Sequence, residues 1–204
     1  MKIENIIRRV LREQQEEEKL LKIPGLKFFN NDWNVLQKFL ESQGNPRYSI
    51  GGDLNLREKE VGTLGNLVRV EGNLSLFGTY FDDSLGSLEY VGGNLDLRDT
   101  DVETLENLVR VEGGLDLGGT RIETLGNLEY VGGSLSLEEC LNLKSLGKLK
   151  YVGRWLDLRG TKLKSFGDLE YVGESLDLEG SLLSKKYERE PIRDMISVGG
   201  VIFF

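Results

Sequence analysis

Pairs of leucines recur at an almost constant interval over most of the chain. Successive pairs are 20, 21, 20, 20, 21 and 20 residues apart. The pairs are Leu54/Leu56, Leu74/Leu76, Leu95/Leu97, Leu115/Leu117, Leu135/Leu137, Leu156/Leu158 and Leu176/Leu178. Leucine alternating with a polar residue is the period-two pattern of a short strand with one buried face. A fixed period of this length is typical of coils that stack and bury their apolar sides against each other. The pattern predicts a mainly β protein, a parallel β-solenoid of about seven to eight coils, with residues 50–180 as its solenoid domain.

Other positions of each coil also form columns. Three residues after each of the last six pairs lies a small polar residue, and these are Thr79, Thr100, Thr120, Cys140, Thr161 and Ser181. A second apolar pair follows with a spacing of three, as in Leu108 and Val111. That spacing suits a turn or a 3₁₀ segment better than a strand. Both 21-residue steps place their extra residue in a connecting arc, near Asp82–Asp83 and Leu141–Asn142. We therefore expect the strands to stay in register.

Residues 1–49 precede the repeats and predict a helical cap. Apolar residues at helical spacing predict an amphipathic helix over Met1–Lys22, which Pro24–Gly25 ends. A second helix is expected over Trp33–Gln43, with Asp32 as its N-cap and Gly44 as its C-cap. Both helices are expected to seal the exposed end of the solenoid. A second interpretation makes the first helix a targeting or partner-binding segment.

Residues 181–204 form the expected C-terminal cap, with a short helix before Pro191 and a return to the repeat pattern. Met195 and Val198 take the places of the second apolar pair, and Ile202 and Phe204 take those of the strand leucines. An eighth strand at this end would be strongly apolar. It is expected either to be covered by the preceding segment or to serve in self-association.

The columns resemble those of a leucine-rich repeat. Leu-x-Leu followed by Thr, Cys or Ser is similar to the strand and turn of that family, and Val91-Gly92-Gly93-Asn94 also resembles the β-helical receptor L domains. The resemblance covers about three quarters of the chain. It implies a buried hydrogen-bonded ladder at the small polar column and a surface that binds protein partners. The coils are short, so we expect extended or 3₁₀ segments on the outer side instead of a long helix.

Composition narrows the classes of function. The net charge is −8 and is uneven along the chain. Residues 1–50 have nine basic and seven acidic side chains, a net charge of +2, and the remaining residues have 17 basic and 27 acidic side chains, a net charge of −10. An acidic body argues against nucleic-acid binding. The chain has no histidine, the commonest general base and nitrogen ligand, and its single cysteine, Cys140, cannot form an internal disulfide. We expect no catalytic residue, cofactor or metal. The first residues are too charged for a signal peptide, and no apolar stretch would cross a membrane, so a cytoplasmic protein without membrane contact is expected.

The outward side chains between the leucines are the first candidate surface. Aspartates occupy several of these positions, and arginines and aromatic residues occupy the positions that flank the leucine pairs. The partner-binding candidates on this surface are Asp96, Arg98, Asp116, Trp155, Asp157 and Arg159, with Arg57 beside them and Phe77 as a second expected exposed aromatic residue. One interpretation is a solvated face of mixed charge whose ion pairs contribute little. The other is a binding surface, because an exposed tryptophan beside arginine is typical of interface anchors.

A second column combines tyrosine with arginine. It consists of Arg69, Tyr90, Arg110, Tyr130, Tyr151 and Tyr171, of which the last three are further partner-binding candidates. Rings in register can stack on each other and on guanidinium groups. The column either shields the apolar residues beneath it or presents an aromatic stripe to a partner or glycan.

These observations favour a non-enzymatic protein-binding module that presents its strand face to a macromolecular partner. The alternative is a structural or assembly protein that oligomerises through its terminal coils. A glycan-binding or glycan-cleaving protein, which would use the aromatic stripe or paired carboxylates, has less support because a flat stacked face offers no cleft.

Overall fold

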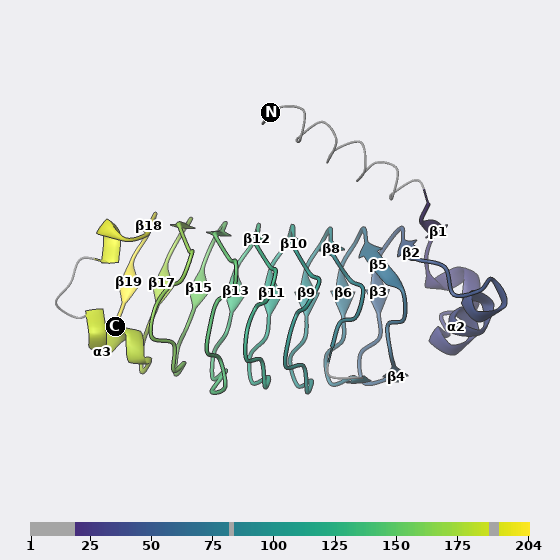
Figure 1. Ribbon diagram of the computed structural model, residues 1–204, viewed down its shortest axis with the longest axis horizontal. Helices are drawn as coiled ribbons and strands as arrows, with labels where there is room; N and C mark the ends of the chain where they lie inside the picture. Colours follow the sequence, from purple (N-terminus) through teal and green to yellow (C-terminus); the bar gives the residue numbers. More distant parts are fainter. Residues whose placement is uncertain (1–18, 82–83, 188–191) are drawn as a thin grey trace, which may run out of the picture.

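The protein is a stack of parallel coils along one long axis (Figure 1). The computed structural model describes residues 19–81, 84–187 and 192–204. An eight-stranded parallel sheet holds the leucine pairs, and neighbouring coils contribute neighbouring strands. Its strands are β3 (Leu54–Asn55), β6 (Leu74–Ser75), β9 (Leu95–Asp96), β11 (Leu115–Asp116), β13 (Leu135–Ser136), β15 (Leu156–Asp157), β17 (Leu176–Asp177) and β19 (Ile202–Phe203). The predicted parallel β-solenoid and its eighth strand are confirmed.

A nine-stranded parallel sheet forms the second side of the stack. Its strands are β1 (Leu21–Ile23), β2 (Tyr48–Ile50), β5 (Leu67–Val70), β8 (Tyr90–Val91), β10 (Arg110–Val111), β12 (Tyr130–Val131), β14 (Tyr151–Val152), β16 (Tyr171–Val172) and β18 (Ser197–Val198). The prediction of a turn or 3₁₀ segment is therefore wrong for Arg110–Val111. A turn does precede it, closed by Leu108 N–H donating to the carbonyl of Leu105 at 2.9 Å. The chain then extends, because the adjacent coils supply parallel pairing partners for Arg110 and Val111.

Extended segments also form the third side of the coils, as predicted. β4 (Glu60–Gly62) pairs with β7 (Tyr80–Phe81), and isolated bridges continue that side through Ser84, Thr104, Thr124 and Ser145. In the part of the chain that the structure describes, the two α-helices lie at the ends of the stack (Figure 1).

The core is a column of leucines between these sides. Leu97, Leu117 and Leu137 have no exposed surface. Leu74 pairs with Leu95 and Leu135 with Leu156, so the sheet stays in register across both 21-residue steps. The second extra residue lies in a turn where Leu141 is 54% exposed. The first, near residues 82–83, lies outside the described residues.

The small polar column forms the expected buried ladder. The hydroxyl of Thr100 donates to the carbonyl of Leu97 at 2.6 Å, and that of Thr120 donates to the carbonyl of Leu117 at 2.7 Å. The thiol of Cys140 donates to the same Leu117 carbonyl at 3.1 Å. Burial raises the pKa of Cys140 to about 11, so this thiol stays protonated at neutral pH.

A helical segment covers the first coil, as predicted. Helix α2 (Trp33–Ser42) begins at the N-cap Asp32, whose carboxylate accepts from Asn34 N–H at 2.8 Å. It buries Trp33, Leu36 and Leu40. The C-cap is Gln43, one residue before the predicted Gly44, which follows with φ +79°. A 3₁₀ turn, η1 (Leu26–Phe29), precedes the helix.

The prediction of a helix over Met1–Lys22 is wrong at the C-terminal end of that range. Leu21–Ile23 is a strand, because its backbone pairs with Tyr48–Ile50 and extends the nine-stranded sheet by one coil. Residues 1–18 of that prediction lie outside the described residues.

The C-terminal segment covers part of the last coil. Helix α3 (Leu182–Tyr187) packs Tyr187 against Phe166 with ring centroids 5.5 Å apart, and η2 (Ile192–Asp194) follows. Ile196 is buried and Met195 is 46% exposed, so the core position predicted for Met195 is wrong. The turn that η2 forms, with Met195 and Ile196 both donating to Ile192, orients Ile196 inward. Phe203 and Phe204 remain about half exposed at the final strand.

Candidate functional site

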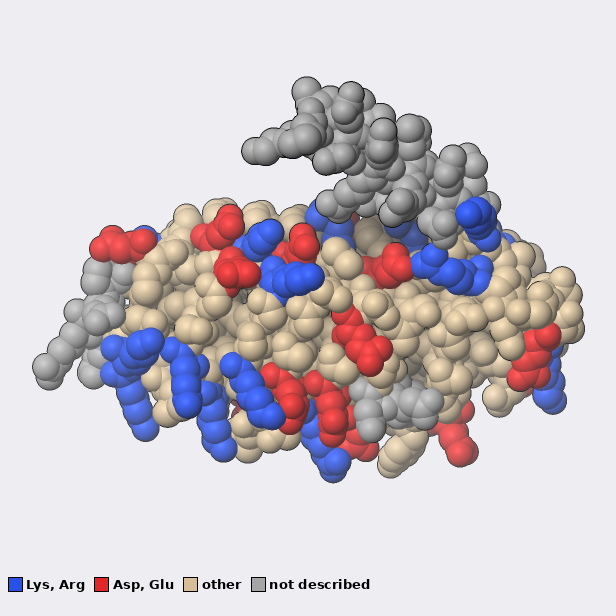
Figure 2. Space-filling model, viewed as in Figure 1, with Lys and Arg blue, Asp and Glu red and all other residues tan. Residues whose placement is uncertain are grey.

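The outward side of the eight-stranded sheet carries six of the nine predicted partner-binding residues. We call this surface, with the residues that flank its strands, the strand face. Parallel pairing places Asp96 beside Asp116 and Asp157 beside Asp177, with Ser136 between these two pairs. In the view of Figure 2, acidic and basic side chains are interspersed along most of the body.

The first cluster on the strand face surrounds Arg98. Its guanidinium forms two hydrogen bonds of 2.9 Å with Asp96, and its Nε lies 3.3 Å from Asp116 Oδ2. Burial alone would raise the pKa of Asp96, but the hydrogen bonds and charge of Arg98, aided by Arg57, outweigh it. The pKa of Asp96 therefore lies below its ordinary value. Arg98 therefore offsets the charge of two adjacent carboxylates.

Phe77 lies between the arginines of this cluster. The Arg57 guanidinium carbon is 4.5 Å from the ring centroid, and that of Arg98 is 5.3 Å away. Phe77 is half-buried, so the expectation of an exposed aromatic residue at this position is wrong. Both guanidinium groups therefore make a cation–π contact with the same ring.

Arg159 is the centre of a second cluster. Its Nη2 lies 2.7 Å from Asp157 Oδ2 and 2.9 Å from Glu138 Oε2, and its Nε lies 3.7 Å from Asp177 Oδ2. Asp157 also accepts from the backbone N–H of Arg159 at 3.0 Å. Asp157 is only 5% exposed. The expected arginine–aspartate pairs are therefore present, but the expected solvation is wrong at this end, where Asp157 and Asp177 are buried.

A shallow hollow of about 270 Å³ lies on the strand face beside the Arg98 cluster. Small residues line it, Gly114 in the fourth coil and Ser134 and Ser136 in the fifth. Trp155 follows Ser134 in the stack, where its carbonyl accepts from Leu135 N–H, and its side chain is 40% exposed. An exposed indole thus lies one coil beyond a depression. Sequence reasoning missed the hollow, although the small residues at positions 114, 134 and 136 were its signal.

A row of side-chain oxygens from successive coils leads to the hollow from the N-terminal side. Asp53 Oδ1 accepts from Asn73 N–H at 2.7 Å, Asn73 Oδ1 accepts from Asn94 N–H at 2.8 Å, and Asn94 Oδ1 accepts from Gly114 N–H at 2.7 Å. Each side chain therefore ties its coil to the next. The last bond of this row, which sequence reasoning also missed, joins Asn94 and Gly114, two residues that line the hollow.

The remaining three candidates, Tyr130, Tyr151 and Tyr171, lie on the nine-stranded sheet and not on the strand face. Their rings stack in series, with centroids 4.8 and 4.9 Å apart. Arg110 lies over Tyr130 at 3.6 Å, and Arg69 lies over Tyr90 at 3.7 Å. The rings are half-buried, and the stacked faces cover each other. This geometry agrees with a shielding role for the column.

The acid dependence of stability offers a test of the Arg98 cluster. Because the pKa of Asp96 is lowered by folding, its ionised form stabilises the protein above the unfolded pKa, near 3.8, and this contribution is lost as the pH falls through the folded pKa. Asp96→Asn is expected to lower the free energy of unfolding by about 0.5–1 kcal/mol at neutral pH. The difference in free energy of unfolding between this variant and wild type, measured by urea unfolding, should become smaller below about pH 3. Glu103→Gln, an exposed carboxylate in the same coil, is the control. A difference that stays constant with pH would contradict the pairing.

The described residues contain no cluster of three or more His, Cys, Asp or Glu side chains that could hold a metal ion. Within the same ranges, none of the helices has the length and apolar character needed to cross a membrane. A scan against protein-family models finds no match, and searches of curated proteins and of solved structures find none. The coils themselves define the class: this chain is a parallel β-solenoid repeat protein.

Proposed function

We propose that this protein is a non-enzymatic protein-binding module that uses the strand face to hold a macromolecular partner. The observation that carries the proposal is the exposed Trp155 near a hollow, with an arginine–aspartate cluster on each side. Tryptophan and arginine are the residues most enriched among interface anchors. The resemblance to short leucine-rich repeats supports the same use of this surface.

Preorganisation favours binding at this surface. Arg98 and Arg159 each contact two or more carboxylates, so much of their side-chain freedom is already lost before a partner arrives. The hollow is bordered by backbone and amide hydrogen bonds that keep its shape. A partner that inserts a side chain beside Trp155 would therefore order few groups on this protein.

A non-enzymatic role also fits the chemistry of the chain. The sequence has no histidine, and the thiol of Cys140 is buried and donates a hydrogen bond within the core. Charge pairs occupy the aspartates of the strand face. We place the module in the cytoplasm, since the single cysteine needs no oxidising compartment.

Assembly through the ends is the second candidate function. Val201, Phe203 and Phe204 are each about half exposed at β19, the last strand of its sheet. An apolar edge strand can pair with another copy. Concentration-dependent light scattering distinguishes the two, because a strict monomer at high concentration would exclude this candidate. Glycan binding by the tyrosine column has less support, since the stacked ring faces are occupied by each other.

The proposal is tested with Trp155→Ala and Arg98→Ala. Each variant is expected to weaken binding to a partner recovered from the source cells by about tenfold or more, as truncation of an interface anchor does. Lys162→Ala, an exposed residue outside the strand face, should bind like wild type. Calorimetry measures the dissociation constant of each variant, and circular dichroism confirms that each variant is folded. Unchanged binding by both strand-face variants would contradict the proposal.

A further inference from the structure

The N-terminal end of the eight-stranded sheet has an open edge. β3 is the terminal strand of this sheet, whereas β1 extends the other sheet one coil further. The pairing that β1 begins continues until Gly51 N–H donates to the Ile23 carbonyl at 2.8 Å. After Ile23 the chain turns at Pro24 into η1, so it supplies no strand beside β3. The described chain therefore supplies β1 of the coil that would precede β3, but no strand that pairs with β3 on this side.

The turn before β3 also lacks a neighbouring coil among the described residues. A Cβ atom built on Gly52 would have only the Pro24 carbonyl oxygen near it, at 3.9 Å. At the equivalent glycines of the next two coils, Gly72 and Gly93, a Cβ would lie 2.3 and 2.5 Å from side-chain oxygens of the preceding coil. Among the described residues, none fills the space in front of Gly52 that a coil occupies elsewhere in the stack.

Backbone groups of β3 face this space. The N–H groups of Leu54 and Leu56 donate to the carbonyls of Asn73 and Ser75 in the second coil. Since alternate residues of a strand direct their backbone groups to opposite sides, the N–H and C=O of Asn55 point toward the open edge. Within the described ranges, β3 pairs with β6 alone, so the sheet supplies no partner on the side to which these two groups point. An extended chain laid along β3 would satisfy both.

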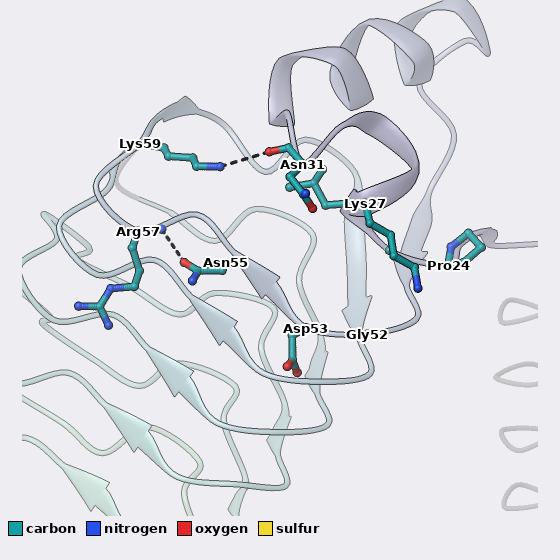
Figure 3. A pocket seen from close by; sticks show the side chains of 10 residues that line it. Pro24, Lys27, Asn31, Gly52, Asp53, Asn55, Arg57 and Lys59 are labelled. Carbon is teal, nitrogen blue, oxygen red and sulfur yellow. Dashed lines mark hydrogen bonds between the residues drawn. The ribbon is translucent and has the colours of Figure 1, made fainter.

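The open edge lines a cleft of about 570 Å³ between β3 and η1 (Figure 3). Three cations, Lys27, Arg57 and Lys59, line it with a single acid, Asp53. The Asp53 carboxylate already accepts two hydrogen bonds from Asn73, at 2.7 and 3.0 Å. The side chain of Lys59 makes a long contact, 3.4 Å, with the Asn31 carbonyl. Arg57 lies over the Phe77 ring at 4.5 Å and 3.9 Å from Asp96, and its side chain is 45% exposed. The cleft is therefore a basic site at the end of an acidic body.

We propose that this cleft binds an extended acidic peptide segment that adds a strand to the open edge of β3. The backbone of the segment pairs with Asn55, and its carboxylates contact Lys27, Arg57 and Lys59. Pairing of backbone groups supplies affinity, and the three cations select acidic sequences. The proposal concerns a different place from the hollow beside Trp155 and does not rest on the partner-binding function proposed above.

Charge selection is tested by fluorescence anisotropy with a labelled peptide that alternates aspartate and valine. A peptide of equal length that alternates lysine and valine should not bind. The double variant Lys27→Gln/Lys59→Gln is expected to weaken binding of the acidic peptide about fivefold to tenfold at low salt. The matched control Lys162→Gln/Lys164→Gln removes the same charge from exposed positions far along the stack and should bind like wild type. Equal affinity of the two double variants would overturn the proposal.

Strand addition is tested separately at Asn55. Asn55→Pro removes the outward N–H at a position where an edge strand tolerates proline, and it should abolish most binding, about tenfold or more. If that variant does not fold, amide exchange of wild-type Asn55 measured by NMR decides, because bound acidic peptide should slow it. No slowing at Asn55, or no binding of the acidic peptide, would overturn the proposal. A dimer whose dissociation exposes the Asn55 amide would also overturn it, by making a second copy the occupant.

Discussion

Replacing Leu137 with alanine is expected to lower the free energy of unfolding by about 3 kcal/mol. The Leu137 side chain has no exposed surface and lies in the leucine column between two neighbouring coils. Its truncation removes apolar contacts with both neighbours and leaves a cavity that the rigid stack cannot close. Since each coil is held by adjacent coils, the loss should affect the whole cooperative unit and not one loop.

Leu141 provides the matched control within the same coil. It lies in the turn that holds the extra residue, and it is 54% exposed. Leu141→Ala should change the free energy of unfolding by less than about 0.5 kcal/mol. Urea unfolding followed by circular dichroism measures both variants. Similar losses from the two substitutions would show that the alternation of inward and outward positions has been placed incorrectly.

Gly147→Ala is expected to destabilise the protein by about 3 kcal/mol, and Gly167→Ala by only about 1 kcal/mol. Both glycines have φ +59° and occupy equivalent turns of adjacent coils, so both variants bear the cost of a left-handed conformation. At Gly147, however, a new Cβ would lie 2.4 Å from the backbone oxygen of Gly126, whereas at Gly167 the nearest atom is 4.0 Å away.

The difference between the two glycine variants isolates the contact between coils. Thermal and urea unfolding of both proteins give this difference directly. Equal destabilisation would mean that the backbones of adjacent coils are not in contact at Gly126 and Gly147. The backbone contact between Gly126 and Gly147 would then not contribute to the stability of the stack.

Much of the fold follows from the period of the leucines. Every coil repeats the same inward positions, so the registers of Leu74 with Leu95 and of Leu135 with Leu156 could be predicted without knowing any single contact. The Thr100 column and helix α2 were predictable for a similar reason, because each depends on local spacing or on a local cap.

Features that depend on pairing between distant segments were not predictable. Leu21–Ile23 is strand because Tyr48–Ile50 lies beside it, and three residues before a proline carry no such signal. Arg110–Val111 is extended because parallel neighbours outweigh a spacing that favours a turn. Ile196 replaces Met195 in the core because a short 3₁₀ turn rotates the chain before β18.

The residues of the candidate site were predictable, but their surroundings were not. The alternation of the strands brings Arg98 and Arg159 to one face, which the sequence indicates. The burial of Asp157, the half-buried position of Phe77 and the hollow at Gly114 depend on side chains contributed by neighbouring coils. Such contacts between coils require the three-dimensional arrangement.

The use of the strand face is tested most directly by site-specific photocrosslinking to the partner recovered from the source cells. A crosslinking side chain at Glu138, on the strand face next to Arg159, is compared with one at Lys162, which is exposed outside it. We predict that the partner crosslinks from position 138, that it does not crosslink from position 162, and that Trp155→Ala abolishes the product. Crosslinking from position 162 alone, or a product from position 138 that survives Trp155→Ala, would contradict binding through the strand face.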